Sequence, residues 1–191
     1  ACWAMANMCR GRPAPPLDVT GPCLPAFVYL LGSEEEEIVM DAMLGISYVV
    51  EGGQDRVAVL LREDPLTRII SLLGSSNTSL VTPSLRTIGS IVTGTDSQTQ
   101  LVLDAGLLNS YHFLLSHVKR GIRKEACWTI SNILAGTIPQ VQMAINNNLL
   151  PQLLRCMFAQ EHEVKKEAVW AIANFTSGAT SQQISHLVSL K

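Results

Sequence analysis

Three short segments of this 191-residue chain share one pair of side chains, a Trp followed four residues later by an Asn. The pairs are Trp3 with Asn7, Trp128 with Asn132, and Trp170 with Asn174. An Asn amide both donates and accepts hydrogen bonds, so a row of these amides can hold the backbone of an extended peptide. Two Trp faces can hold the aliphatic stem of a cation, in a contact worth about 0.5–2 kcal/mol.

A carboxylate precedes two of these Trp residues by one helical turn, and the candidates are Glu125 and Glu167. At about 100° per residue, Glu125 shares a helix face with Trp128 and Asn132, and the aliphatic residues of that segment fall on another face. The carboxylates can meet the head of the bound cation. For one isolated helix, a core Trp beside a solvated or capping Asn is the simpler interpretation. Three copies of the pair favour a site for an extended, Lys/Arg-rich peptide.

The pairs belong to a longer repeat that closes on a glycine. The closing glycines are 41, 42, 42 and 42 residues apart, at Gly11, Gly52, Gly94, Gly136 and Gly178. One interval contains three helical patterns, at 96–106, 107–117 and 123–136. Three helices in about 42 residues are typical of armadillo repeats, and no segment alternates with the period of a strand. We expect the closing glycines to be left-handed C-caps.

The sequence therefore predicts an all-α fold, an armadillo-repeat solenoid with a right-handed superhelix. We expect the last helix of one repeat at 1–11, full repeats at 12–52, 53–94, 95–136 and 137–178, and the start of another at 179–191. Stacked repeats would place the third helices along one concave wall. We also expect several prolines at or near helix starts, namely Pro22, Pro65, Pro83, Pro139 and Pro151.

Composition narrows the functional classes. Hydrophobic residues make up 47% of the chain, charged residues 16%, and the net charge is −2, which argues against disorder and against nucleic-acid binding. No apolar run is long enough for a membrane span, and we see no signal peptide. The five cysteines form no C-x-x-C pair and are predicted to be reduced. We expect no metal, no cofactor and no catalytic activity, since no nucleophile–base pair or nucleotide-binding motif is present.

Four segments resemble the importin-α (karyopherin-α) family of nuclear import adapters. They are WAMANMCRG at 3–11, LRTIGSIVTGTDSQTQLVLDAG at 85–106, EACWTISNILAG at 125–136 and EAVWAIANFTSG at 167–178. In repeat order, the chain resembles the end of the fourth repeat through the start of the ninth. The resemblance implies cargo proteins with basic nuclear localisation signals as partners, and shuttling between cytoplasm and nucleus. It also implies importin-β and an export factor as partners, through regions outside this sequence, and no binding to nucleic acid or membranes.

The resemblance also assigns binding residues. The minor signal-binding site would comprise Ser90, Val92, Thr99, Glu125, Trp128, Ser131, Asn132, Glu167, Trp170 and Asn174. Trp3 and Asn7 would be the last part of the major site. Tyr48 and Arg86 would stand where the Trp/Asn ladder is interrupted, and the charge of Arg86 would repel basic side chains there.

Three positions depart from the family pattern. Ser90 replaces the usual Asn, Leu44 the usual Trp and Gly45 the usual Ala. Because Gly in a helix costs up to about 1 kcal/mol relative to Ala, we expect Gly45 to loosen the central groove. Two alternatives stay open. A catenin-type protein would bind acidic extended ligands in a Lys/Arg-lined groove, and a scaffold would hold apolar helices, as Leu44 alone would suggest.

Overall fold

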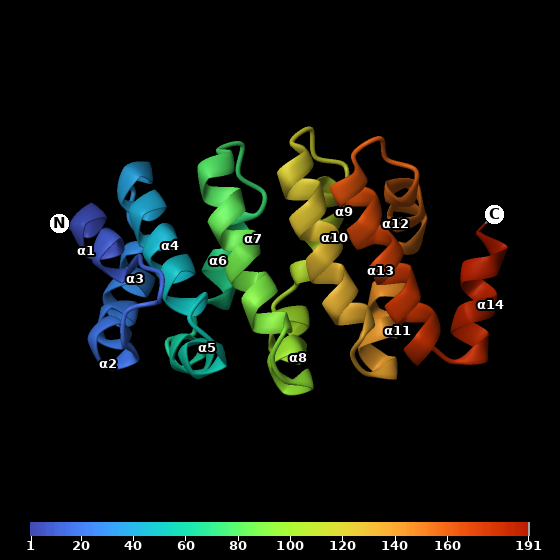
Figure 1. Cartoon of the computed structure of the whole chain (residues 1–191), viewed down its shortest axis with the longest axis horizontal. Helices are drawn as coiled ribbons and strands as arrows, with labels where there is room; N and C mark the ends of the chain where they lie inside the picture. The colour runs from blue at the N-terminus through green and yellow to red at the C-terminus, as the bar shows by residue number, and fades with distance from the viewer. Residues whose placement is uncertain (191) are drawn as a thin grey trace. The chain divides into compact units, whose positions relative to one another are not determined.

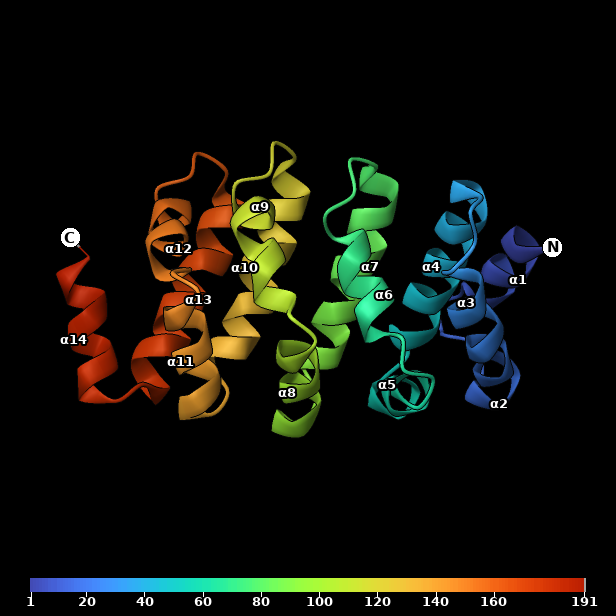
Figure 2. The same ribbon diagram turned by 180° about the vertical axis from the view of Figure 1, so that it is seen from behind.

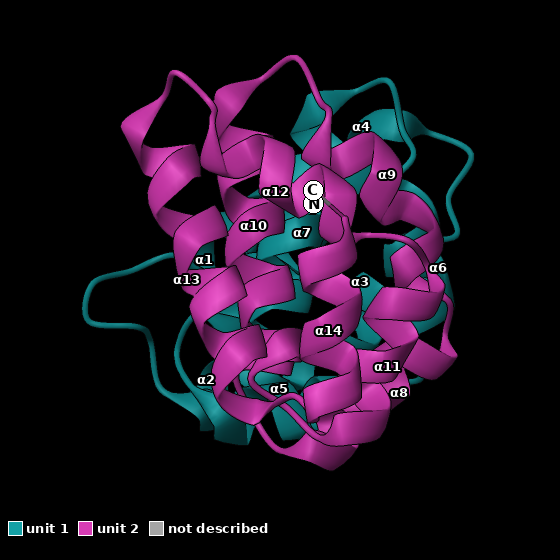
Figure 3. Ribbon diagram, turned by 90° about the vertical axis from the view of Figure 1, so that its right-hand side faces the viewer, with its two compact units in different colours: residues 1–91 teal, residues 92–191 magenta. Residues whose placement is uncertain are grey.

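A computed structural model describes residues 1–190, and these residues form helices joined by turns, with no strand (Figure 1). The chain divides into two compact units, residues 1–91 and 92–191, coloured separately in Figure 3. This confirms the predicted all-α class. No helix in the described part of the chain combines the length and the apolar character that crossing a membrane requires.

The first unit begins with a long helix from the Trp3/Asn7 segment and continues with short helices around a second long one. Its helices are α1 (Cys2–Cys9), α2 (Leu17–Thr20), η1 (Gly21–Cys23), α3 (Leu24–Leu30), α4 (Glu36–Val50), α5 (Gln54–Leu61), α6 (Leu66–Leu72) and α7 (Thr78–Val92). The boundary between the units falls one residue before the end of α7. Helix α4 packs against α1, α3 and α5.

The second unit repeats a short helix, a second short helix and a long third one. Its helices are α8 (Asp96–Asp104), η2 (Leu107–Ser110), α9 (Tyr111–Leu115), α10 (Arg120–Leu134), α11 (Ile138–Asn146), α12 (Leu150–Met157), α13 (His162–Gly178) and α14 (Ser181–Ser189). The long helices α10 and α13 lie side by side in Figure 1, and Figure 2 shows α9 and α12 on the opposite side of them. Helix α13 packs against both α10 and α12.

The faces of α10 are divided as the helical period predicts. The side chains of Ala126, Ile130 and Ile133 are completely buried. Trp128 and Asn132 lie on the other side and remain half-buried. Burial of apolar surface contributes about 25 cal/mol per Å², so the aliphatic face fixes which way α10 turns, and the Trp–Asn face is left toward solvent.

A Thr-x-x-Gln motif begins three helices of the second unit. Thr95 and Gln98, Thr137 and Gln140, and Thr180 and Gln183 each form a capping box at the start of α8, α11 and α14. Two of these glutamines also reach the preceding first helix. Gln140 Nε2 donates to the Asp96 carbonyl at 2.8 Å, and Gln183 Nε2 donates to the Ile138 carbonyl at 3.3 Å. The motif therefore caps each helix and joins it to its neighbour.

The closing glycines do not adopt the predicted left-handed conformation. Among the described residues, only Gly53 and Gly106 are glycines with positive φ, at 137° and 87°. Gly136 instead makes room, because an added Cβ would collide with the side-chain amide of Gln140 and approach the Ile133 carbonyl to 3.1 Å. Gly52 makes the same room for Arg56, whose Cδ would lie 2.6 Å from an added Cβ. The repeating glycine thus serves the close approach of the next helix.

Pro83 also differs from its predicted place near a helix start, since α7 begins at Thr78 and contains Pro83 in its first half. Pro22, Pro139 and Pro151 occupy the first positions of η1, α11 and α12, as expected. A proline within a helix costs one backbone hydrogen bond. In α7 the buried apolar residues Leu80, Val81 and Leu85 surround it and carry the helix through.

Candidate peptide-binding groove

Six of the predicted minor-site residues and one further lysine line a single groove of the second unit. The groove has a volume of about 370 Å³ and is lined by Trp128, Ser131, Asn132, Lys166, Glu167, Trp170 and Asn174. All seven residues come from α10 and α13, which pack directly against each other. The Trp–Asn pairs of two successive third helices are therefore brought together on one surface.

Both asparagines of this groove are held by hydrogen bonds. Asn132 Nδ2 donates to the Trp128 carbonyl at 3.0 Å, one turn earlier on α10. Asn174 Nδ2 crosses to α10, where it donates to the Ser131 carbonyl at 3.1 Å and to Ser131 Oγ at 2.9 Å. These bonds fix each amide plane and occupy N–H donors. The amide oxygens are the groups best placed to accept an N–H from an extended peptide.

The aromatic and charged side chains of the groove are accessible. Trp170 is 57% exposed, and Trp128 and Glu167 are half-buried. Glu125, which lies one turn before Trp128, forms an ion pair with Lys124 at 3.8 Å. Trp faces beside a carboxylate form a suitable environment for a cation on an aliphatic stem.

Three predicted minor-site residues lie elsewhere. Val92 and Thr99 are each only 4% exposed, and Thr99 Oγ1 donates to the Val92 carbonyl at 3.5 Å, so both offer little surface to a ligand. Ser90 is a half-buried residue of α7 in the first unit, and its carbonyl accepts a hydrogen bond from Gln54 Nε2 at 2.8 Å. Their assignment to the site stays a prediction.

The first unit carries its own Trp–Asn pair on α1. Trp3 is 66% exposed, and Asn7 Nδ2 donates to the Trp3 carbonyl at 2.8 Å. This repeats the bond between Asn132 and the Trp128 carbonyl. The same four-residue spacing thus produces the same local geometry in both units, because residues i and i+4 stack on one helix face.

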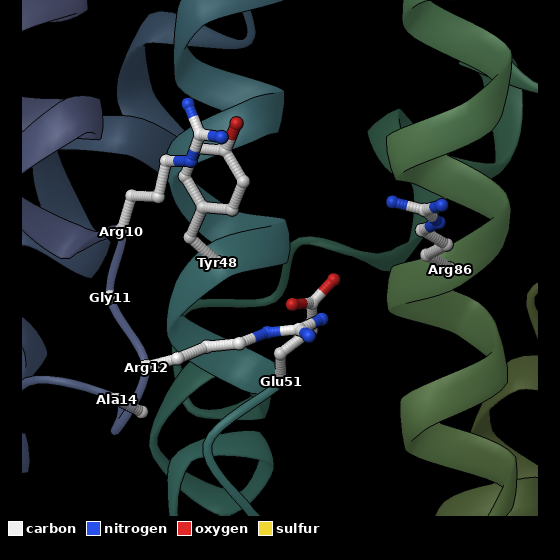
Figure 4. Close-up of a pocket in the computed structure, with 7 residues that line it drawn as sticks. All are labelled: Arg10, Gly11, Arg12, Ala14, Tyr48, Glu51 and Arg86. Atoms are coloured by element: carbon white, nitrogen blue, oxygen red, sulfur yellow. The ribbon is translucent and has the colours of Figure 1, made fainter.

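A larger pocket of about 670 Å³ lies in the first unit and has a basic lining (Figure 4). It contains both predicted interruption residues and is lined by Arg10, Gly11, Arg12, Ala14, Tyr48, Glu51 and Arg86. The Arg10 guanidinium lies over the Tyr48 ring, 5.8 Å from its centroid. Three guanidinium groups against one carboxylate give the pocket a net positive charge.

Sequence reasoning missed four of the groove and pocket residues. Lys166 was interpreted as part of a solvated turn, although it stands four residues before Trp170 and so shares its helix face. Arg10, Arg12 and Glu51 carried no such signal, because they follow the ends of α1 and α4. Within residues 1–190, no three His, Cys, Asp or Glu side chains form a group that could hold a metal ion.

Comparison with known proteins agrees with this architecture. The model of the armadillo/beta-catenin-like repeat family matches residues 95–135 and 137–177. Importin subunit alpha-2 of Arabidopsis thaliana is 43% identical over 70 residues, which are 37% of this chain and 13% of that protein. Importin subunit alpha-B of Dictyostelium discoideum is 44% identical over 57 residues, which are 30% of this chain and 11% of that protein.

Among solved structures, a designed armadillo repeat protein in complex with the peptide (KR)4 superposes with a TM-score of 0.89 at 26% identity. The superposition covers 99% of this chain and 79% of the designed one. Family model, relatives and fold agree: this chain is an armadillo-repeat protein with repeats related in sequence to those of the importin alpha subunits.

Proposed function

We propose that this chain is a nuclear import adapter, or part of one, that binds extended Lys/Arg-rich localisation signals in the groove between α10 and α13. The observation that carries the proposal is the convergence of Trp128, Asn132, Glu167, Trp170 and Asn174 on that one groove. The relationship to importin alpha subunits supports it, as does the designed neighbour that was solved with the peptide (KR)4. Such an adapter would shuttle between cytoplasm and nucleus with its cargo.

The peptide backbone would be held by the asparagines. Asn174 is fixed by Ser131, and Asn132 by the turn before it, so both amide oxygens are oriented before the ligand arrives. A preorganised acceptor loses less side-chain entropy on binding than a free one. Because the contact is to backbone N–H groups, it would select an extended conformation and leave sequence choice to the neighbouring Trp and Glu residues.

The choice of basic side chains would come from Trp128, Trp170 and Glu167. Each Trp contact to a cation is worth about 0.5–2 kcal/mol, and the carboxylate attracts the charged head. Lys166 lines the same groove and opposes this attraction. We therefore expect opposite effects from the two neighbouring charges: Glu167→Ala weakens binding of a basic peptide, and Lys166→Ala strengthens it.

Calorimetric titration of the chain with a Lys/Arg-rich signal peptide tests the proposal. Trp170→Ala should weaken binding about 2- to 30-fold, the equivalent of one cation–π contact. Asn132→Ala should weaken it as well, and added salt should weaken it further. Phe158→Ala is the matched control, since Phe158 is 84% exposed and lies outside the groove lining. If the folded wild type ignores basic peptides, or if Phe158→Ala weakens binding as much as Trp170→Ala, the proposal is wrong.

A second candidate ligand is favoured by the pocket of the first unit. Arg10, Arg12 and Arg86 would repel a basic segment and attract Asp, Glu or phosphate groups, which is the behaviour of a catenin-type site (Figure 4). Titration with an acidic extended peptide separates the two ligands. Affinity for it that is lost in Arg86→Ala and kept in Trp170→Ala would assign acidic ligands to the first unit.

A further inference from the structure

Two cysteines of the second unit face each other from different helices. Cys127 on α10 is completely buried, and Cys156 on α12 is 7% exposed. Both are free thiols, and the two thiols are hydrogen-bonded to each other. Cys156 Sγ also lies 3.6 Å from the Leu115 carbonyl, as a donor to it. The chain therefore places a pair of reduced sulfurs within bonding reach of each other at the centre of one repeat.

One of the two thiols is reachable from solvent. Cys156 lines a groove of about 270 Å³ together with Leu115, Ser116, Arg123, Gln152, Arg155, Ala159 and Glu161. Trp128, Trp170 and the two asparagines of the peptide groove are not among these residues. A molecule as small as a peroxide can enter a space of this size. Cys127 is reached only through Cys156.

The surroundings distinguish the roles of the two sulfurs. The hydrogen bond from Cys127 lowers the pKa of Cys156, and the nearby Arg123 guanidinium lowers it further, against the opposing effect of burial. The same hydrogen bond and burial raise the pKa of Cys127. Arg123 is held in place, since its Nη1 donates to the His117 carbonyl at 2.6 Å and its Nη2 contacts Glu161 at 2.6 Å. Cys156 is therefore the sulfur that becomes a thiolate first.

We propose that Cys127 and Cys156 form a peroxide-sensitive dithiol that closes to a disulfide between α10 and α12. The Cys156 thiolate attacks one oxygen of hydrogen peroxide, the O–O bond breaks, and the departing hydroxide takes a proton and leaves as water. The Cys127 sulfur then attacks the sulfenic sulfur of Cys156, an S–S bond forms and the S–O bond breaks. The second hydroxide leaves with the Cys127 proton as water, so two thiols are oxidised and one peroxide is reduced.

The chain contains an internal competitor for this reaction. Cys9 and Cys23 in the first unit are also hydrogen-bonded to each other, but burial raises the pKa of Cys9 to about 11. Cys9 is only 1% exposed. Thiolates react with peroxide and thiols do not, so Cys156 should be oxidised before this second pair.

The test is oxidation of the full chain with one equivalent of hydrogen peroxide, alkylation of the remaining thiols, digestion and mass spectrometry. The expected product is a crosslinked peptide pair that joins Cys127 to Cys156, with loss of both free thiols together. Cys127→Ser should stop the reaction at Cys156 sulfenic acid, which dimedone traps, and Cys156→Ser should leave Cys127 unoxidised. A disulfide formed first between Cys9 and Cys23, or between two chains, overturns the proposal.

A second measurement on the wild type avoids any folding defect of the variants. With limiting iodoacetamide at neutral pH, Cys156 should be alkylated faster than Cys127 and faster than Cys9. Equal rates for the three cysteines would contradict the assigned roles. Neither readout depends on peptide affinity, so the result stands apart from the proposed function.

Discussion

Replacement of Gly45 by Ala separates a sequence-based expectation from a structure-based one, because the two differ in sign. Gly45 lies inside α4, where helix propensity alone predicts that Ala stabilises the chain by up to about 1 kcal/mol. In the structure, an added Cβ would approach Phe27 Cε1 to 2.6 Å and Cε2 to 2.7 Å. Phe27 belongs to α3 and is completely buried. Gly45 therefore does not loosen this region; its missing side chain is the space that the Phe27 ring fills.

The magnitude follows from two opposing contributions. Overpacking a filled core costs about 1–3 kcal/mol, and the helix gain offsets at most about 1 kcal/mol of it. We expect Gly45→Ala to lower the unfolding free energy by about 1–2 kcal/mol, a fall of roughly 0.5–1.5 M in the urea midpoint. Urea titration followed by far-UV circular dichroism measures this shift.

Two further variants decide whether the Phe27 ring is the cause. In a Phe27→Leu background the ring is gone, so Gly45→Ala should lose most of its cost or become stabilising. Gly121→Ala is the control, since Gly121 lies in the first turn of α10 and an added Cβ there meets nothing within 4 Å. That variant should be at least as stable as wild type. If Gly45→Ala also matches or exceeds wild type, the packing argument is refuted.

Two other predictions concern the second unit. Gly136→Ala should lower the unfolding free energy by about 1–2 kcal/mol, since its Cβ would displace the buried Gln140 amide from its hydrogen bonds, whereas Gly178→Ala, with nothing within 4 Å, should have little effect. Equal urea midpoints for the two variants would contradict this. The pKa of Glu161 is lowered by a hydrogen bond from its own backbone and then by Arg123, so the stability it contributes is present at neutral pH and is lost as the pH falls through that lowered pKa. Glu161→Gln should therefore unfold at lower urea than wild type at pH 7, and the difference should vanish at about pH 3; a difference that is unchanged at low pH would exclude the ion pair as its source.

Much of the fold could be predicted from local patterns. The alternation of apolar and polar positions on α10 predicted its buried residues Ala126, Ile130 and Ile133, because the helical period is a property of neighbouring residues. The spacing of four between Trp128 and Asn132 likewise placed both on one face. The repeat of about 42 residues indicated how many helices to expect in each segment, since each repeat buries its apolar face against the next.

Contacts between residues far apart in the chain could not be predicted in this way. Asn174 and Ser131 are 43 positions apart, and only the packing of α13 against α10 brings the amide to the hydroxyl. Arg10 and Arg12 meet Tyr48 and Arg86 in one pocket because the end of α1 and the helices α4 and α7 lie in the same unit.

The same distinction explains the glycines. The sequence by itself determined the helical repeat, the exposed Trp–Asn faces and the family resemblance, all of which depend on residues within a few turns of one another. The roles of Gly45 and Gly136 were decided only by the tertiary structure, because a glycine records no side chain and therefore no sign of the Phe27 ring or the Gln140 amide that occupies its place. Close packing in three dimensions determines what each empty position is for.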